Sequence, residues 1–338
     1  MTDARAIRAR TCVLDGARRV ARAPAVLVGV WLVNLVLAVP FALAIRDALD
    51  THFGSSLAAH DAAHGFSTGW WGEYAARVEG LAATFTSSVI GFAAVLRNLS
   101  DLADGRRPIA VIAGVIGVWL LAWTFLWGGI LDRYARNHPT RAGGFFAACG
   151  AHAGRMLRLG FVAGLAYALL FRYVHPLLLD AIFDSLTRDL AVERTAFLIR
   201  LMLYALFGAL LAALHIVTDV ARVRAIVENR RSMLGAYLAA WRLLRARPLA
   251  VLGIYLLTGV MLAIWLLLYA SIAPGASTSG AWVWIALVAG QLYLAGRLWL
   301  KLQVPAALIA LYRAEVARGE LDLMPPPVWP ETPPVAEE

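Results

Sequence analysis

Six stretches of the chain are long and apolar enough to cross a membrane as α-helices. A spanning helix needs about 20 consecutive, mostly apolar residues. The stretches that meet this requirement are residues 24–45, 109–131, 159–179, 197–217, 249–271 and 281–300. The pattern therefore predicts an all-α integral membrane protein with six transmembrane helices, formed by a single domain over residues 1–313.

Another fairly apolar segment, residues 81–99, is interrupted by polar residues such as Ser87 and Arg97. As a seventh span it would reverse every later helix and export the arginine-rich breaks, against the positive-inside rule. Its apolar residues recur at helical spacing. We predict an amphipathic helix over 81–99, within an outer loop of residues 46–108. It lies on the outer surface or packs on the bundle.

Arginines are concentrated in alternate breaks between the spans. The arginine-rich segments are residues 1–23, 132–158 and 218–248. The intervening loops are mixed or acidic, or carry no charge. Because arginine and lysine mark the cytoplasmic side, both ends of the chain are predicted to be cytoplasmic, in the inner membrane of a bacterium.

The first span leaves one alternative open, a cleaved signal peptide. Ala42-Leu43-Ala44 resembles a cleavage site. The apolar run and the segment before it are both long for a signal peptide. We therefore favour an uncleaved first span.

Composition supports a lipid environment. Apolar residues make up 61% of the 338 positions, charged residues 16%, and the mean hydropathy is +0.69. Soluble domains usually contain about 25% charged residues. The net charge of +9 would suggest nucleic acid in a soluble chain, but here the arginines lie between spans, so no nucleic acid partner is expected. Cys12 and Cys149 fall on the predicted cytoplasmic side, where thiols stay reduced.

Three of the spans begin with similar sequences. The segments PAVLVGVWLV, LGFVAGLAYA and PLAVLGIYLL start at Pro24, Leu159 and Pro248. Each follows an arginine-bearing stretch with helical periodicity. Internal self-similarity of this kind marks duplicated units. We predict three units, 1–131, 132–219 and 220–313, each an in-plane amphipathic helix followed by a transmembrane hairpin.

The clearest in-plane helix is predicted at 228–246, where Leu234, Tyr237, Trp241 and Leu244 share one face. The arginines beside such helices meet anionic lipid headgroups, at about 1 kcal/mol each. The arginines predicted to interact with lipid are Arg158, Arg231, Arg242, Arg245 and Arg247. The cytoplasmic helices also offer surface to a protein partner, as does the proline-rich, acidic tail 314–338, which is predicted to be disordered.

The residues Asp219, Arg222, Arg231 and Ser232 lead into this amphipathic helix. The in-plane-helix-then-span arrangement resembles uncharacterised bacterial multi-pass proteins that are similar to the membrane domain of some glycerophosphodiester phosphodiesterases. The resemblance covers most of the membrane region and implies a shared architecture. It carries over neither phosphodiesterase activity nor site residues.

The outer loop contains three histidines, His52, His60 and His64. His60 and His64 are four residues apart, so on a helix both could bind one zinc ion, with His52 or Glu73 as a third ligand. The pattern is similar to a zinc-protease motif, but Asp61 replaces the glutamate base. The alternative is a polar loop that happens to contain histidines.

Several polar residues fall within or beside the spans. Those predicted to line a transport path are Arg172, His175, His215, Gln291 and Arg297. Ionisable groups inside a bilayer are functional candidates by default. Two alternatives are that Arg297 reaches the interface and that Gln291 serves helix packing. No acidic residue lies in the middle of a predicted span, which disfavours proton-coupled transport.

Gly160 and Gly164 form a GxxxG element in the third span. Such a pair lets another helix approach closely. We therefore expect a tight helix contact at this point.

Three functions are consistent with these sequence features. The first is a non-catalytic membrane component that interacts with lipid or supports a complex. The second is a transporter of a small or lipid-like solute, since transporters often use repeated units. The third is a membrane metalloenzyme resting on the histidines. The sequence contains no P-loop, dinucleotide fingerprint or nucleophile elbow, so no cofactor is expected and the first function is favoured.

Overall fold

The computed structural model describes residues 3–56, 60–61, 67–85, 100–101, 104–105, 110–190, 192–273 and 281–317. Every element in these ranges is helical, so the predicted all-α class is confirmed. The α-helices are α1 (Asp3–Ala21), α2 (Pro24–Ser55), α4 (Thr68–Arg77), α6 (Ala110–Arg136), α7 (Ala142–Leu169), α8 (Phe183–Thr187), α9 (Glu193–Val227), α10 (Met233–Ala246), α11 (Pro248–Ile272) and α12 (Ala281–Ala317). Two π-helical segments, η2 (Leu170–Val174) and η3 (Leu177–Ile182), join α7 to α8.

Six helical segments in the described ranges are long and apolar enough to cross a membrane, the number predicted. Several extend beyond the predicted spans. For example, α9 runs to Val227 and α12 to Ala317, although the predicted spans end at residues 217 and 300. The end of α12 is buried, Leu311 and Glu315 included, so packing stabilises the helix past the apolar stretch. Residues 314–317, predicted as part of the tail, thus belong to α12, and the remainder of the tail lies outside the described residues.

Two sharp elbows separate an arginine-bearing helix from the span that follows it. Ala23, between α1 and α2, has φ −132° and ψ 55°, and Arg247, between α10 and α11, has φ −137° and ψ 53°. A proline opens the next helix in both cases, at Pro24 and Pro248. Proline is favoured in the first turn of a helix and lacks the N–H that would continue a preceding one. Pro24 and Pro248 each mark a helix boundary in this way, whereas Pro40 and Pro305 lie inside α2 and α12.

The second predicted unit lacks such an elbow. Leu159 occupies the place of the proline, and α7 continues without a break from Ala142 to Leu169. The prediction of a separate in-plane helix before the third span is therefore wrong for this unit. The reason is that leucine keeps the backbone N–H and the ring-free geometry that a helix interior requires.

The arginine-bearing helices pack on the spans that precede them. The first half of α7 packs on α6, and α10 packs on α9. Helix α1, the first helix described, packs on α12 and α11. Helices α6 and α9 also end alike, at Asn137 (φ 56°) and Asn229 (φ 50°), residues that tolerate the left-handed conformation of a helix end. The threefold repeat remains a prediction that these likenesses support.

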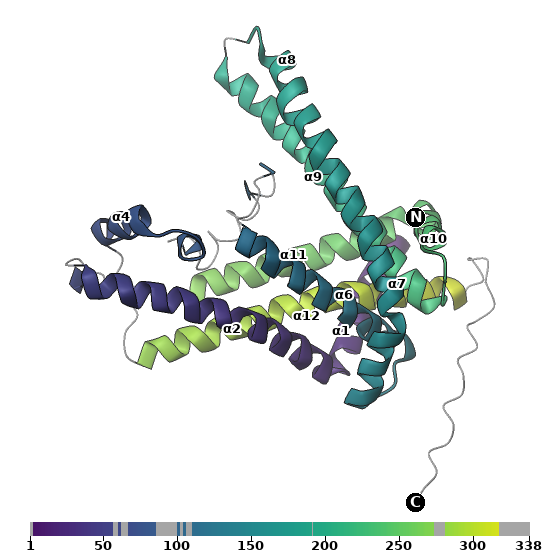
Figure 1. Cartoon of the computed structure of the whole chain (residues 1–338). Helices are drawn as coiled ribbons and strands as arrows, with labels where there is room; N and C mark the ends of the chain where they lie inside the picture. The colour runs from purple at the N-terminus through teal and green to yellow at the C-terminus, as the bar shows by residue number, and fades with distance from the viewer. Residues whose placement is uncertain are drawn as a thin grey trace, which may run out of the picture.

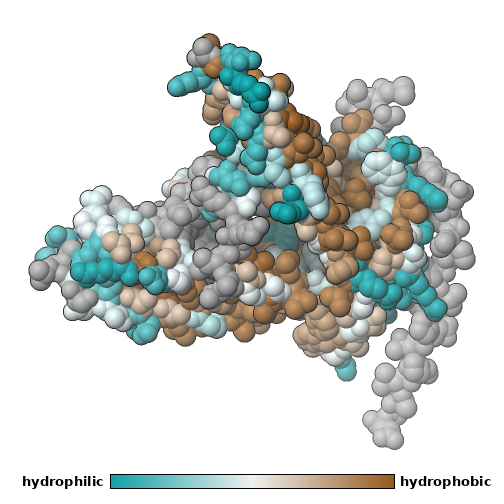
Figure 2. Space-filling view, turned by 45° about the horizontal axis from the view of Figure 1, so that its top comes forward, coloured by the Kyte–Doolittle hydropathy of each residue, from teal (hydrophilic) through white to brown (hydrophobic). Residues whose placement is uncertain are grey.

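The hydrophobic core lies at the arginine-rich end of the bundle. It joins α1, α10 and the starts of α2 and α11 to the C-terminal halves of α6, α9 and α12. The hairpin formed by the second half of α7, α8 and the first half of α9 diverges from the other spans (Figure 1). It has its own small cluster around Leu179 and Phe207. Hydrophobic residues cover much of the hairpin and the main bundle, while polar residues gather towards the hairpin tip (Figure 2).

Glycines allow two of these helix contacts to be very close. A Cβ atom at Gly16 would lie 2.8 Å from the Ala307 backbone nitrogen on α12. A Cβ atom at Gly129 on α6 would lie 2.4 Å from Cys149 Sγ on α7. By contrast, a Cβ at Gly164 would meet nothing within 4 Å, and a Cβ at Gly160 would make only an ordinary contact with Thr124 of α6 (3.7 Å). The GxxxG element therefore makes no tight contact among the described residues.

The outer loop begins later than predicted, because α2 continues to Ser55. Its helix α4 is capped by Ser67, whose Oγ accepts a hydrogen bond from the Trp70 backbone N–H (3.3 Å). Burial raises the pKa of Tyr74, whose hydroxyl donates to the Ala82 carbonyl (3.0 Å). Of the helix predicted at 81–99, only residues 81–85 are described, and Ala82–Thr84 form a single 3₁₀ turn.

Candidate functional site: a polar cluster between the spanning helices

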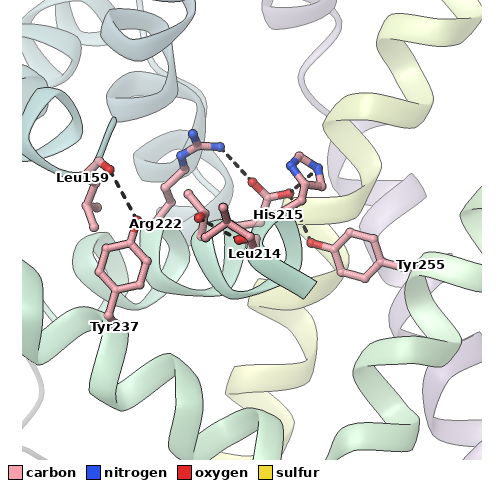
Figure 3. Close-up of polar contacts among 8 residues, drawn as sticks. Leu159, Leu214, His215, Arg222, Tyr237 and Tyr255 are labelled. Carbon is pink, nitrogen blue, oxygen red and sulfur yellow. Dashed lines mark hydrogen bonds and ion pairs between the residues drawn. The ribbon is translucent and has the colours of Figure 1, made fainter. Parts of the chain in front are cut away.

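Three polar residues of α9 lie on one face of that helix, His215, Asp219 and Arg222, because they are four and three residues apart. Arg222 Nη1 donates to Asp219 Oδ1 (2.8 Å), and the Tyr255 hydroxyl of α11 donates to Asp219 Oδ2 (3.1 Å). His215 Nε2 lies 3.3 Å from the same Oδ2. Figure 3 shows these three partners converging on one carboxylate. A carboxylate inside a membrane protein is costly unless it is paired in this way.

The Asp219 carboxylate is well enclosed, with 12% of its side chain exposed, against 22% for Arg222 and 58% for His215. His215 is therefore the member of the cluster that the surroundings reach most readily. The cluster is thus accessible from one side and closed on the other.

Tryptophans of α6 form an aromatic wall beside the cluster. Trp119, Trp123 and Trp127 recur every four residues, so they share one face. Lys301 of α12, the single lysine of the sequence, places Nζ 3.5 Å from the Trp123 ring and 4.4 Å from the Trp119 ring. The Arg222 guanidinium lies 5.9 Å from the Trp127 ring. Cation–π contacts of this kind stabilise positive charge away from water.

Lys301 is also near enough to Asp219, Arg222 and Arg297 for their charges to act on it. These four groups comprise three cations and one carboxylate. Such an excess of positive charge attracts an anion, and the tryptophan faces suit an apolar neighbour. The arrangement has the parts of a site for an anionic or amphipathic ligand, although no step of a reaction follows from it.

A further hydrogen bond ties the neighbouring helices together. The Tyr237 hydroxyl of α10 donates to the Leu159 carbonyl of α7 (3.3 Å, Figure 3). Thr218 Oγ1 donates to the Leu214 carbonyl within α9 (2.8 Å). The first of these bonds joins α10 to α7 beside the cluster, and the second is local to α9.

The five residues predicted to line a transport path do not form one continuous set. His215 belongs to the cluster, and Arg297 lies near Lys301, with its guanidinium 5.6 Å from the Tyr293 ring. The Gln291 amide oxygen accepts a hydrogen bond from Trp31 Nε1 (2.9 Å), which joins α12 to α2.

Arg172 and His175 lie in the diverging hairpin. The His175 ring packs against Phe207, with centroids 5.1 Å apart. Phe207 is eight residues before His215 on α9, which corresponds to about 12 Å along the helix. These two predicted residues are therefore separated from the cluster.

The predicted metal ligands are only partly described. His52 is buried against Trp70 and Tyr74, with ring centroids 5.8 and 5.3 Å away. His60 is exposed, and His64 lies outside the described residues. Within the described ranges no group of three His, Cys, Asp or Glu side chains could hold a metal ion. The metal site stays a prediction, because His64 is not covered by that observation.

Four of the five arginines predicted to meet lipid are exposed, namely Arg158, Arg231, Arg242 and Arg245. Arg247 differs, since its Nε donates to Glu315 Oε2 (3.1 Å), and the Glu315 side chain is 3% exposed. That ion pair connects the α10–α11 elbow to the end of α12.

Helix α10 buries a face other than the predicted apolar face of Leu234, Tyr237, Trp241 and Leu244. Its buried residues are Met233, Ala236, Ala239, Ala240 and Leu243. Small side chains let helices approach closely, so the alanines face inwards. The larger Leu234 and Trp241 are exposed, although Tyr237 and Leu244, from the same predicted face, are partly buried.

Sequence reasoning missed Asp219, Tyr255 and Lys301 as site residues. Asp219 lay two residues beyond the predicted fourth span, whereas α9 continues past it. Two signals pointed to the site, namely the spacing of His215, Asp219 and Arg222, and the presence of a single lysine. Comparisons of the chain with protein-family models, curated proteins and solved structures give no match.

Proposed function

We propose that this polytopic membrane protein is a non-catalytic component that interacts with anionic lipid at its arginine-rich end. The observation that carries the proposal is the exposed face of α10. Leu234, Leu238 and Trp241 are 71%, 61% and 48% exposed, and the Arg245 guanidinium lies 4.9 Å from the Trp241 ring. An apolar stripe beside arginines is typical of a helix that lies in the membrane interface.

The elbow at Arg247 supports this orientation of α10, because it turns the chain sharply between α10 and α11. The Arg247–Glu315 ion pair fixes the elbow on α12. With its alanine face on α9, the helix directs leucine and tryptophan towards acyl chains and leaves Arg242 and Arg245 for headgroups. The resemblance to the membrane domain of glycerophosphodiester phosphodiesterases supports only a shared architecture.

Replacing Arg242 and Arg245 by glutamine is expected to reduce the enrichment of anionic lipid around the protein. Each arginine contributes about 1 kcal/mol near an anionic surface, or about fivefold in binding. The measurement is the ratio of phosphatidylglycerol to phosphatidylcholine that is extracted with the protein in polymer-bounded membrane patches.

The matched control replaces Arg188 and Arg194 by glutamine, since both are exposed near the hairpin tip. It removes the same charge from the predicted opposite side of the membrane. Equal enrichment for the Arg242/Arg245 variant and the wild type would contradict the lipid role of α10.

The second candidate function is translocation of a lipid-like solute, and the polar cluster favours it. An excess of positive charge beside a tryptophan wall suits a phosphate group with an attached chain. Replacing Lys301 by methionine removes the charge and keeps the length of the side chain.

In proteoliposomes that contain fluorescent phosphatidylglycerol, wild-type protein should accelerate its transfer between leaflets. Lys301→Met should slow that transfer at least about tenfold, because a charge-assisted contact is lost. Transfer no faster than in protein-free liposomes would exclude this candidate.

A further inference from the structure

A cavity of about 390 Å³ lies at the arginine-rich end, between the α1–α2 elbow, the end of α6 and the start of α7. Arg22, Arg133 and Thr140 line it together with apolar residues of α2, α6 and α7. It is separate from the polar cluster, with which it shares no lining residue. Its volume falls in the range of ligand-binding pockets.

Arg133 is the unusual member of the lining, because it is a cation only 8% exposed. Its Nη2 donates a hydrogen bond to the Arg22 carbonyl (3.2 Å). Among the described residues, no carboxylate forms an ion pair with Arg133. Most of its five N–H donors therefore remain for a ligand. Burying a cation without an acidic partner is costly in a membrane protein. An anion that enters the cavity would offset the free-energy cost of burying the Arg133 charge.

The apolar residues of the lining form a row along α2 that suits an extended acyl chain. Val26, Val30 and Val33 follow one another along a single face of α2, and Leu126 and Phe145 face them from α6 and α7. From Pro24 to Val33 the helix rises about 14 Å. The arginines stand at one end of this row, where α2 begins, and the row runs from there into the span.

We propose that this cavity binds one anionic glycerophospholipid. Its phosphate contacts Arg133 and Arg22, since guanidinium groups match phosphate geometry. One acyl chain lies along Val26, Val30 and Val33. The inference rests on the proposed function in one respect, because it requires anionic lipid at the arginine-rich end of the protein. It adds a specific site in the cavity, which is distinct from the exposed face of α10.

Two variants test the two halves of the site. Arg133→Gln removes the charge. Gly29→Phe fills the cavity from α2 and leaves both arginines in place. A Cβ at Gly29 meets nothing within 4 Å, so the backbone accepts a side chain there. The matched controls are Arg194→Gln at an exposed site and Gly164→Phe, another helix position with nothing within 4 Å of the added Cβ.

The measurement is native mass spectrometry of the full chain released from nanodiscs with equal phosphatidylglycerol and phosphatidylcholine. Wild type and both controls should retain one phosphatidylglycerol under activation that removes other lipids. Arg133→Gln and Gly29→Phe should each lower that retention at least about tenfold, because one loses the charge-assisted bonds and the other the chain volume. Thermal unfolding confirms folding, and Gly29→Phe decides the question if Arg133→Gln does not fold.

Retention that is unchanged in Gly29→Phe, or phosphatidylcholine held as firmly as phosphatidylglycerol, would overturn the inference. These outcomes leave the function proposed for α10 intact if bulk enrichment still depends on Arg242 and Arg245. If bulk enrichment does not depend on Arg242 and Arg245 while one lipid is still held through Arg133, the function proposed for α10 is overturned and the cavity proposal is supported.

Discussion

Replacing Gly16 by alanine is expected to destabilise the protein, even though alanine is the better helix former by about 1 kcal/mol. The added Cβ would lie 2.8 Å from the Ala307 nitrogen and 2.9 Å from the Gln303 carbonyl oxygen. Both are backbone atoms of α12 and cannot rotate away. Overpacking of this kind costs about 1–3 kcal/mol. It also strains the bond from Gln303 Nε2 to the Val13 carbonyl (3.2 Å), which joins the same two helices.

The measurement is thermal unfolding in detergent, followed by far-UV circular dichroism. Gly208→Ala on α9 is the control, because its Cβ would meet nothing within 4 Å. That variant should be neutral or slightly stabilising. If Gly16→Ala behaves like Gly208→Ala, α1 and α12 are not in the close contact described above.

Asp219→Asn is expected to lower stability by about 3 kcal/mol, since breaking a buried ion pair leaves an uncompensated charge. Arg222 would then lose its carboxylate partner, and Lys301 would lose the negative charge of Asp219 that acts on it. The asparagine oxygen can still accept the hydrogen bond from Tyr255, but its NH₂ group cannot accept the one from Arg222, so the change removes that hydrogen bond together with the charge. The measurement is the free energy of unfolding in mixed detergent micelles.

A double variant, Asp219→Asn with Arg222→Gln, provides the control. Because it removes both partners, it should recover part of the loss, which a double-mutant cycle measures as coupling between the pair. Tyr255→Phe, which removes only a neutral donor, should cost about 1 kcal/mol. Additive losses in the cycle would show that the Asp219–Arg222 pair contributes no coupling energy.

The number of spans could be predicted because length and hydropathy alone decide whether a helix can cross a membrane. The boundaries between an arginine-bearing helix and the next span could be predicted in the first and third units, where Pro24 and Pro248 favour the start of a helix. The second unit was mispredicted because an arginine-bearing periodic stretch fits an in-plane helix and the first half of a longer helix equally well. Only the residue at the junction, Leu159, distinguishes them.

The site was harder to predict, because its members come from α9, α11 and α12 and meet only through packing. In the sequence, Tyr255 is one of many aromatic residues in the spans. Its role is evident only from the structure, in which α11 lies beside Asp219. The close contacts at glycines were equally hard to predict from the sequence. Gly16 and Gly129 form tight interfaces while Gly164 forms none, because spacing indicates a helix face but not whether another helix lies against it.

The packing of α1 on α12 has a consequence for biosynthesis. Val13 and Gln303 are 290 residues apart, and a ribosome adds about 5–20 residues per second, so α1 waits roughly 15–60 s for its partner. During that interval the Gly16 face of α1 has no helix to cover it. A nascent chain that stops before α12 therefore leaves this face exposed, a feature by which membrane quality control can distinguish unfinished chains from finished ones.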